Sequence, residues 1–96
     1  MRKAVFEDMN FKINENEKKV LLILASEYDE AFFYFSAIVE ETKLELHQVR
    51  RACRSLRKKG LAEFSQLFDD EGMINGSGYG CSFEGKKLVD SFDAIA

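Results

Sequence analysis

The residues best placed to do chemistry in this chain are cations gathered in one short segment. From Leu46 to Gly60 the sequence holds six Lys or Arg residues and neither Asp nor Glu. The whole chain has 14 basic and 17 acidic residues, so the residues outside this segment include 8 basic and all 17 acidic ones. Because binding to phosphate depends on the local field, this segment indicates a polyanionic partner despite the net charge of −3.

Helical periodicity places these cations on one side of a helix. The segment 45–59 is predicted to be helical because apolar residues recur at i, i+3, i+4 and i+7. These buried positions are Val49, Ala52, Cys53 and Leu56. The polar side chains lie opposite: His47, Arg51, Arg54 and Lys58 at the centre, Arg50 and Arg57 on one flank, and Gln48 and Ser55 on the other. Gly60 ends the helix, after lysines that suit the negative end of its dipole.

Side chains of these types fit the major groove of duplex DNA. Arg can form two hydrogen bonds to guanine, and Gln can form two to adenine. Residues near the start of a recognition helix usually contact bases, and later ones contact phosphate. We therefore expect base contacts from the first polar residues: His47, Gln48 and Arg51. Arg50 or Arg54 is a further candidate for a base contact. Phosphate contacts are expected from the last cations: Arg57, Lys58 and Lys59.

The rest of the chain predicts the elements that position this helix. Asn14 and Glu17 form a capping-box pattern, and the apolar run at 20–25 predicts a buried central helix. A second helix is predicted to begin after a cap at Ser36. The expected order is helix, short strand, helix, helix, strand, turn, strand and helix, over residues 14–29, 30–35, 36–41, 45–59, 61–68, 69–72, 73–83 and 84–92.

This order and several short motifs resemble the winged helix-turn-helix of MarR-type bacterial transcription regulators. Residues 35–62 hold a small-residue helix, a Thr-x-Leu turn at 42–44 and a helix ending in Leu-x-Lys-Lys-Gly-Leu at 56–61. Residues 79–88 resemble the family's second wing strand and its entry into the next helix. The resemblance implies an α+β, mainly α, fold: a three-helix core, a two- or three-stranded antiparallel wing and a short C-terminal helix. It also implies a small sequence-specific regulator that reads the major groove with helix 45–59.

The wing and the chain ends differ from the family pattern. No Lys or Arg occurs from Leu61 to Gly85, and the predicted wing tip carries Asp69, Asp70 and Glu71. We therefore do not expect the wing to enter a phosphate-lined minor groove. Residues 1–13 are interpreted as an N-terminal arm and 14–96 as the winged-helix domain, a unit without the long terminal helices of MarR-like dimers.

Other candidate sites are interpreted structurally. Cys53 and Cys81 are too few for a disulfide framework and are interpreted as reduced core thiols. The single histidine, His47, lies opposite Cys53 on the helix, so no metal site is expected. The glycines at 76–80 are not followed by the Lys-Ser/Thr of a phosphate-binding loop, so this segment is interpreted as part of a flexible wing. With no recognisable catalytic triad or carboxylate pair, we expect neither catalysis nor a cofactor.

Composition limits the class of protein and its partners. The chain has no signal peptide pattern, and its apolar runs are too short to span a bilayer, so we expect a cytoplasmic protein without membrane contact. Duplex DNA is the expected partner. The alternative is a protein-interaction module whose basic helix docks on an acidic protein. Self-association or a protein contact is a further expectation, either through the N-terminal arm or through exposed members of an aromatic group: Phe32, Phe33, Tyr34 and Phe35.

Overall fold

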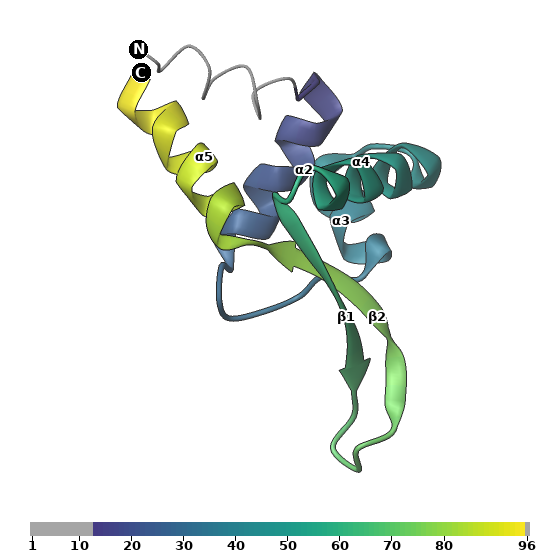
Figure 1. Ribbon diagram of the computed structural model, residues 1–96. Coiled ribbons are helices and arrows are strands. Elements are labelled where there is room, and N and C mark those ends of the chain that lie inside the picture. The colour runs from purple at the N-terminus through teal and green to yellow at the C-terminus, as the bar shows by residue number, and fades with distance from the viewer. Residues whose placement is uncertain (1–12, 96) are drawn as a thin grey trace.

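The computed structural model describes residues 13–95, a helical core from which a two-stranded wing projects (Figure 1). The elements are α2 (Glu15–Ser26), α3 (Phe35–Thr42), α4 (Leu46–Lys58), β1 (Ala62–Phe68), β2 (Ile74–Cys81) and α5 (Phe83–Ile95). This is the predicted order, and the α+β, mainly α, class is confirmed. The predicted N-terminal arm lies outside the described residues except for Ile13, which packs against the core.

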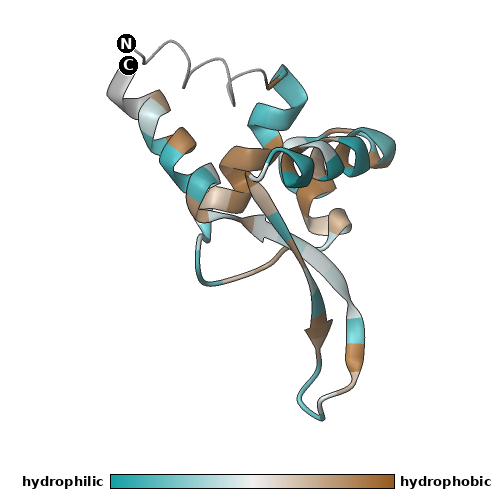
Figure 2. Ribbon diagram, viewed as in Figure 1, coloured by the Kyte–Doolittle hydropathy of each residue, from teal (hydrophilic) through white to brown (hydrophobic). Residues whose placement is uncertain are grey.

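Helix α2 is the centre of the core. Its predicted capping box is present: the Asn14 side chain accepts from the Glu17 amide at 2.8 Å, and Glu17 accepts from the Asn14 amide at 2.9 Å. Val20, Leu21 and Leu24 are fully buried, and Figure 2 shows hydrophobic colour on the second half of α2. The helix ends at Ser26, before the predicted end near Asp29. The backbone leaves helical geometry at the C-cap Glu27, with a φ of −121° and a ψ of 36°, and Asp29 follows with a φ of 69°.

Helix α3 begins two residues earlier than a cap at Ser36 predicts, and that predicted cap is wrong. The N-cap is Tyr34, which makes no side-chain cap hydrogen bond, so Ser36 falls inside the first turn. The preceding residue, Phe33, pairs with Tyr79 of β2 through two backbone hydrogen bonds of 2.8 and 3.0 Å. The predicted short strand at 30–35 is thus reduced to this one bridged residue, and the N-cap of α3 follows it directly.

The turn between α3 and α4 forms without proline. Lys43 has a φ of 65°, and its amide donates to the Val39 carbonyl at 2.8 Å. Thr42 donates its hydroxyl to the Ile38 carbonyl at 2.7 Å and accepts from the Leu44 amide at 3.3 Å. Residues 43–45 therefore complete a tight helix-turn-helix.

Helix α4 matches its predicted extent and buried face. Glu45 and Lys59 are its caps, and Gly60, with a φ of 81°, ends it. The amides of Gly60 and Leu61 donate to the carbonyls of Arg57 and Leu56, a Schellman closure that needs this left-handed glycine. The four predicted inward residues are buried: Val49, Ala52, Cys53 and Leu56.

The wing is an antiparallel hairpin whose base is built into the core. Ala62 pairs with Cys81 and Phe64 with Tyr79, and the register shifts between Gln66 and Phe68. Phe83 begins α5 instead of ending β2, because Ser82 accepts from the Gly85 amide at 3.0 Å and donates to the Gly60 carbonyl at 2.7 Å. A Cβ at Gly85 would lie 2.2 Å from the Leu61 carbonyl oxygen, so only glycine fits this approach.

Both cysteines lie in the core, as predicted for Cys53 and Cys81, and neither is in a disulfide. Burial raises the pKa of Cys53 to about 12 and that of Cys81 to about 11. Within residues 13–95, no three His, Cys, Asp or Glu side chains are grouped so that they could hold a metal ion. No helix of this described range is long and apolar enough to cross a membrane.

Candidate nucleic-acid interface

The exposed side of α4 brings the predicted site residues together. Val49, Cys53 and Leu56 hold one side of the helix against α2 and the wing base, so the other side faces solvent. Gln48 is half-buried, and the other seven predicted residues are exposed: His47, Arg50, Arg51, Arg54, Arg57, Lys58 and Lys59. Figure 2 shows α4 as largely hydrophilic.

Most of these cations have no acidic partner. Within the described part of the chain, no ion pair involves the four arginines or Lys58; the pairs join Lys59 to Glu17, Lys86 to Asp90 and Lys87 to Glu84. The helix itself carries no Asp or Glu between Leu46 and Lys58. Within residues 13–95, the four arginines and Lys58 on this surface are therefore not paired directly with a carboxylate.

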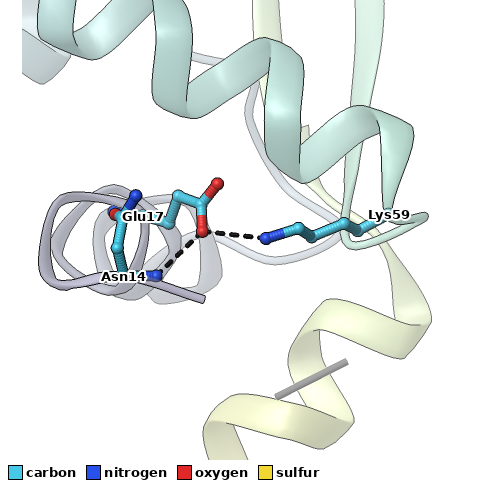
Figure 3. Close-up of polar contacts among 3 residues, drawn as sticks. All are labelled: Asn14, Glu17 and Lys59. Carbon is cyan, nitrogen blue, oxygen red and sulfur yellow. Dashed lines mark hydrogen bonds and ion pairs between the residues drawn. The ribbon is translucent and has the colours of Figure 1, made fainter. Parts of the chain in front are cut away.

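Lys59 differs from the other cations because it faces α2. Its Nζ lies 3.0 Å from Oε1 of Glu17, the same oxygen that accepts from the Asn14 amide (Figure 3). The Glu17 side chain is 5% exposed. Burial alone raises the pKa of Glu17, but hydrogen bonds from Ser55, Asn14 and Lys59 together with the Lys59 charge hold that pKa below its ordinary value. Glu17 is thus an ionised group that joins the start of α2 to the end of α4.

Gln48 has a local hydrogen bond at the start of the helix. Its Oε1 accepts from the Glu45 amide at 2.9 Å. This bond supports the first turn of α4, where backbone amides have no helical partner. A two-bond contact with adenine needs both the oxygen and the nitrogen of the amide. The oxygen is engaged in this bond, and among residues 13–95 the nitrogen has no acceptor.

Two clefts border the basic face. One of about 210 Å³ lies between the start of α2 and the first half of α4, with Asn16, His47 and Arg51 in its lining. The other, about 610 Å³, lies between the second half of α4 and the wing, with Arg54, Lys58 and Tyr79 in its lining. The predicted base-contacting and phosphate-contacting ends of α4 therefore face different concave surfaces.

Sequence reasoning missed the aromatic side chains beside α4. The guanidinium carbon of Arg50 lies 5.7 Å from the centre of the Phe35 ring, and that of Arg57 lies 5.0 Å from the Phe64 ring. Tyr79 contacts both rings. A helical projection places Arg50 and Arg57 on one flank but contains no information about the strand beside them.

The aromatic group at 32–35 is packed within the chain. Phe32, Phe33 and Phe35 are half-buried, and only Tyr34 among the four is exposed. The Tyr34 hydroxyl donates to the Asn75 carbonyl at 2.8 Å, which braces the wing. The expected self-association through these rings stays a prediction.

The wing tip has the acidic character expected from the sequence. Asp69, Asp70 and Glu71 are exposed there. The Asp69 carboxylate accepts from the amides of Glu71 and Met73 at 2.9 and 3.0 Å, so it shapes the turn. The tip also exposes three apolar side chains at 60 to 63%: Phe68, Met73 and Ile74.

Comparison with known proteins identifies the fold. No protein-family model matches the chain, and no curated protein matches it in sequence. MepR of S. aureus, solved with DNA, matches at a TM-score of 0.73 and 21% identity, over 98% of this chain and 73% of that one. ZitR of Lactococcus lactis, a zinc-responsive MarR family member, matches at a TM-score of 0.70 and 21% identity, over 88% of this chain and 54% of ZitR. A Ralstonia eutropha protein matches at a TM-score of 0.66 and 22% identity, over 83% of this chain and 96% of that protein.

These likenesses confirm the predicted fold. At 21 to 22% identity they concern architecture, and the architecture is the winged helix-turn-helix of MarR-type proteins. The chain spans about half the length of ZitR, at 54%, so it corresponds to a part of that protein.

Proposed function

We propose that this chain is a small DNA-binding transcription regulator that reads the major groove of duplex DNA with α4. The observation that carries the proposal is the exposed face of α4, where four arginines and Lys58 have no acidic partner within the described residues. α4 follows the tight turn from α3, the position of a recognition helix. The likeness to MepR, which is solved with DNA, supports the same assignment.

The geometry suggests how the work is divided along α4. His47 and Arg51 lie beside the cleft next to α2, near the start of the helix, and are proposed as base contacts. Gln48 is proposed as a base contact through its free amide nitrogen. Arg50 and Arg54 are further candidates, and Arg57 and Lys58 are proposed to contact phosphate.

Lys59 receives a different role in this proposal. Its ammonium group is engaged by Glu17, a buried carboxylate on α2. Moving Lys59 to a phosphate would leave that carboxylate without its cation, which is costly in a buried position. We therefore propose that Lys59 fixes α4 on α2 while its neighbours bind DNA.

The proposal also defines partners and location. Duplex DNA is the ligand, no reaction is assigned to the protein, and the protein must share a compartment with DNA, which in a bacterium is the cytoplasm. The basic helix as a docking site for an acidic protein is the competing outcome of the test described next.

The decisive experiment is selection from a pool of random duplexes at low salt, followed by titration of the selected sequence. Wild type is expected to enrich a defined sequence, and Arg51→Ala is expected to lose that preference. Lys87→Ala is the matched control, because it removes one exposed cation from α5 and leaves α4 intact. Failure of the wild type to bind any duplex would contradict the proposal, and binding to an acidic protein through Arg51 and Arg54 would then replace it.

A further inference from the structure

Two arginines on one flank of α4 rest on aromatic rings from other elements. Arg50 lies over Phe35 of α3, with 5.7 Å between its guanidinium carbon and the ring centre. Arg57 lies over Phe64 of β1 at the shorter distance of 5.0 Å. A guanidinium within about 6 Å of a ring centre is attracted by the negative face of that ring.

Tyr79 of β2 connects the two rings. Its ring stacks on that of Phe35, with 5.7 Å between the ring centres and 26° between the ring planes. It meets the Phe64 ring edge-on, with 5.4 Å between the centres and 67° between the planes. Tyr79 is 5% exposed, and its backbone is fixed by the two hydrogen bonds to Phe33. Phe35, Tyr79 and Phe64, here called the aromatic bridge, therefore form a continuous series of ring contacts from Arg50 to Arg57.

Phe64 is the outermost ring of the aromatic bridge. It is 41% exposed, whereas its register partner Tyr79 is buried. Its strand contains no Lys or Arg, and the nearest cation that the structure places on its ring is Arg57. The Phe64 ring therefore has two contacts in the structure: its neighbour Tyr79 and the guanidinium of Arg57.

This contact places Arg57 at the edge of the cleft between α4 and the wing. The cleft is lined by cations of α4 on one side and by Tyr79 on the other. A free arginine side chain samples many rotamers, and a ring beneath the guanidinium reduces that number before any ligand arrives. The N–H groups at the guanidinium edge stay available while its face lies on the ring.

We infer that the wing takes part in DNA binding through Phe64, a positioning residue that holds Arg57 at the edge of this cleft for a backbone phosphate of the bound duplex. The inference rests on the proposed function and deepens it. It assigns the wing a role that needs no cation of its own and no contact between the acidic tip and DNA.

The test begins with the free protein. In wild type the side-chain protons of Arg57 are expected upfield of their position in Phe64→Leu, because the ring current of Phe64 acts on them. Phe68→Leu is the matched control: it makes the same substitution on the same strand, at a more exposed ring that has no cation contact in the structure. Equal Arg57 shifts in wild type and Phe64→Leu would overturn the inference without involving DNA.

The second step measures affinity for the selected duplex. Phe64→Leu is expected to weaken binding about two- to fivefold, the range of a cation–π contact at an exposed site. Phe64→Tyr, which retains a ring, and Phe68→Leu are both expected to bind like wild type. Thermal unfolding of each variant checks that the wing stays folded.

A double-mutant cycle distinguishes positioning from a general structural effect. In an Arg57→Ala background, Phe64→Leu is expected to have no further effect on affinity. An equal loss with and without Arg57 would overturn the inference, since the ring would then act independently of that arginine. If wild type binds DNA and Phe64→Leu binds it equally well, the inference alone is overturned. If wild type binds no duplex, the proposed function is overturned as well.

Discussion

Helix α4 and the wing are anchored in the same core, but the surfaces that they expose to solvent differ in charge. α4 and its C-cap Lys59 together expose six cations and no carboxylate. The wing has no cation on either strand, and its tip combines exposed carboxylates with apolar side chains such as Met73 at 63% exposure. An overall charge of −3 hides this division.

The difference concerns how each element can meet a polyanion. Phosphate attracts α4 along its whole exposed face and repels the wing tip. Screening at physiological salt acts over about 8 Å, so the tip does not cancel the attraction at a distant α4. The wing is therefore expected to contribute at its base, where Phe64 meets Arg57, and not at its tip.

The largest expected effect follows removal of cations from the centre of the α4 face. Arg51→Ala, and Arg54→Ala if that further candidate also reads a base, should each weaken specific binding by about 1–3 kcal/mol, because under the proposed function each change removes a contact with a base edge. Both residues are exposed, so the free energy of unfolding should change by no more than about 0.5 kcal/mol. Titration of the selected duplex and urea unfolding measure the two quantities. A loss of folding equal to the loss of binding would contradict this prediction.

The next effect concerns the ion pair that holds α4 on α2. Glu17→Gln should lower the free energy of unfolding by about 1 kcal/mol at neutral pH, because Lys59 loses its ionised partner. The pKa of Glu17 is lowered in the folded state, so its contribution is present above its ordinary value of 4.5 and is lost as pH falls through the folded pKa.

Urea unfolding as a function of pH tests this prediction. Wild type and Glu17→Gln should converge in stability as the solution is acidified below pH 4.5, the ordinary pKa. A constant difference between them down to low pH would show that the Glu17 charge is not the cause. Lys86→Ala is not a suitable control, since Lys86 has its own pair with Asp90; Asn16→Ala on the same helix turn is a better one.

A smaller and different effect is expected at Lys58. Lys58→Ala should weaken binding to all duplexes alike and make the slope of log affinity against log salt shallower by about one unit. Lys59→Ala should change that slope less, since its charge is already paired with Glu17. Affinity measured over a range of salt concentrations compares the two neighbours directly. Equal slopes for both variants would show that Lys59 contacts phosphate as well.

The smallest effect is expected at the wing tip. Asp70→Asn should leave affinity unchanged or increase it slightly, because it removes an exposed charge that phosphate repels. Asp70 is the suitable site because Asp69 holds the turn through two backbone amides. Asp70→Lys sharpens the comparison: a tip far from DNA predicts an unchanged salt slope, and a steeper slope would show that the tip lies near phosphate.

Local patterns predicted most of the helical framework. Asn14 and Glu17 stand three residues apart as a capping box requires, and Gly60 follows the last periodic residue of α4. Both signals act between neighbours in the chain and need no tertiary contact. Ser36 shows the limit of this approach: its side chain is a good cap, but α3 begins at Phe35, directly after the N-cap Tyr34 that follows the residue bridged to Tyr79.

By itself the sequence determined where charge and apolar surface lie: the cations of α4 opposite Val49 and Leu56, and a wing without cations. These follow from residue type and from the fixed geometry of a helix. Only the tertiary structure decided what each cation does. Lys58 and Lys59 are adjacent and alike in sequence, yet one faces solvent and the other meets Glu17 across 42 residues of chain. Arg57 meets Phe64 only because the hairpin folds back beside α4, and such contacts depend on packing between elements that no local pattern records.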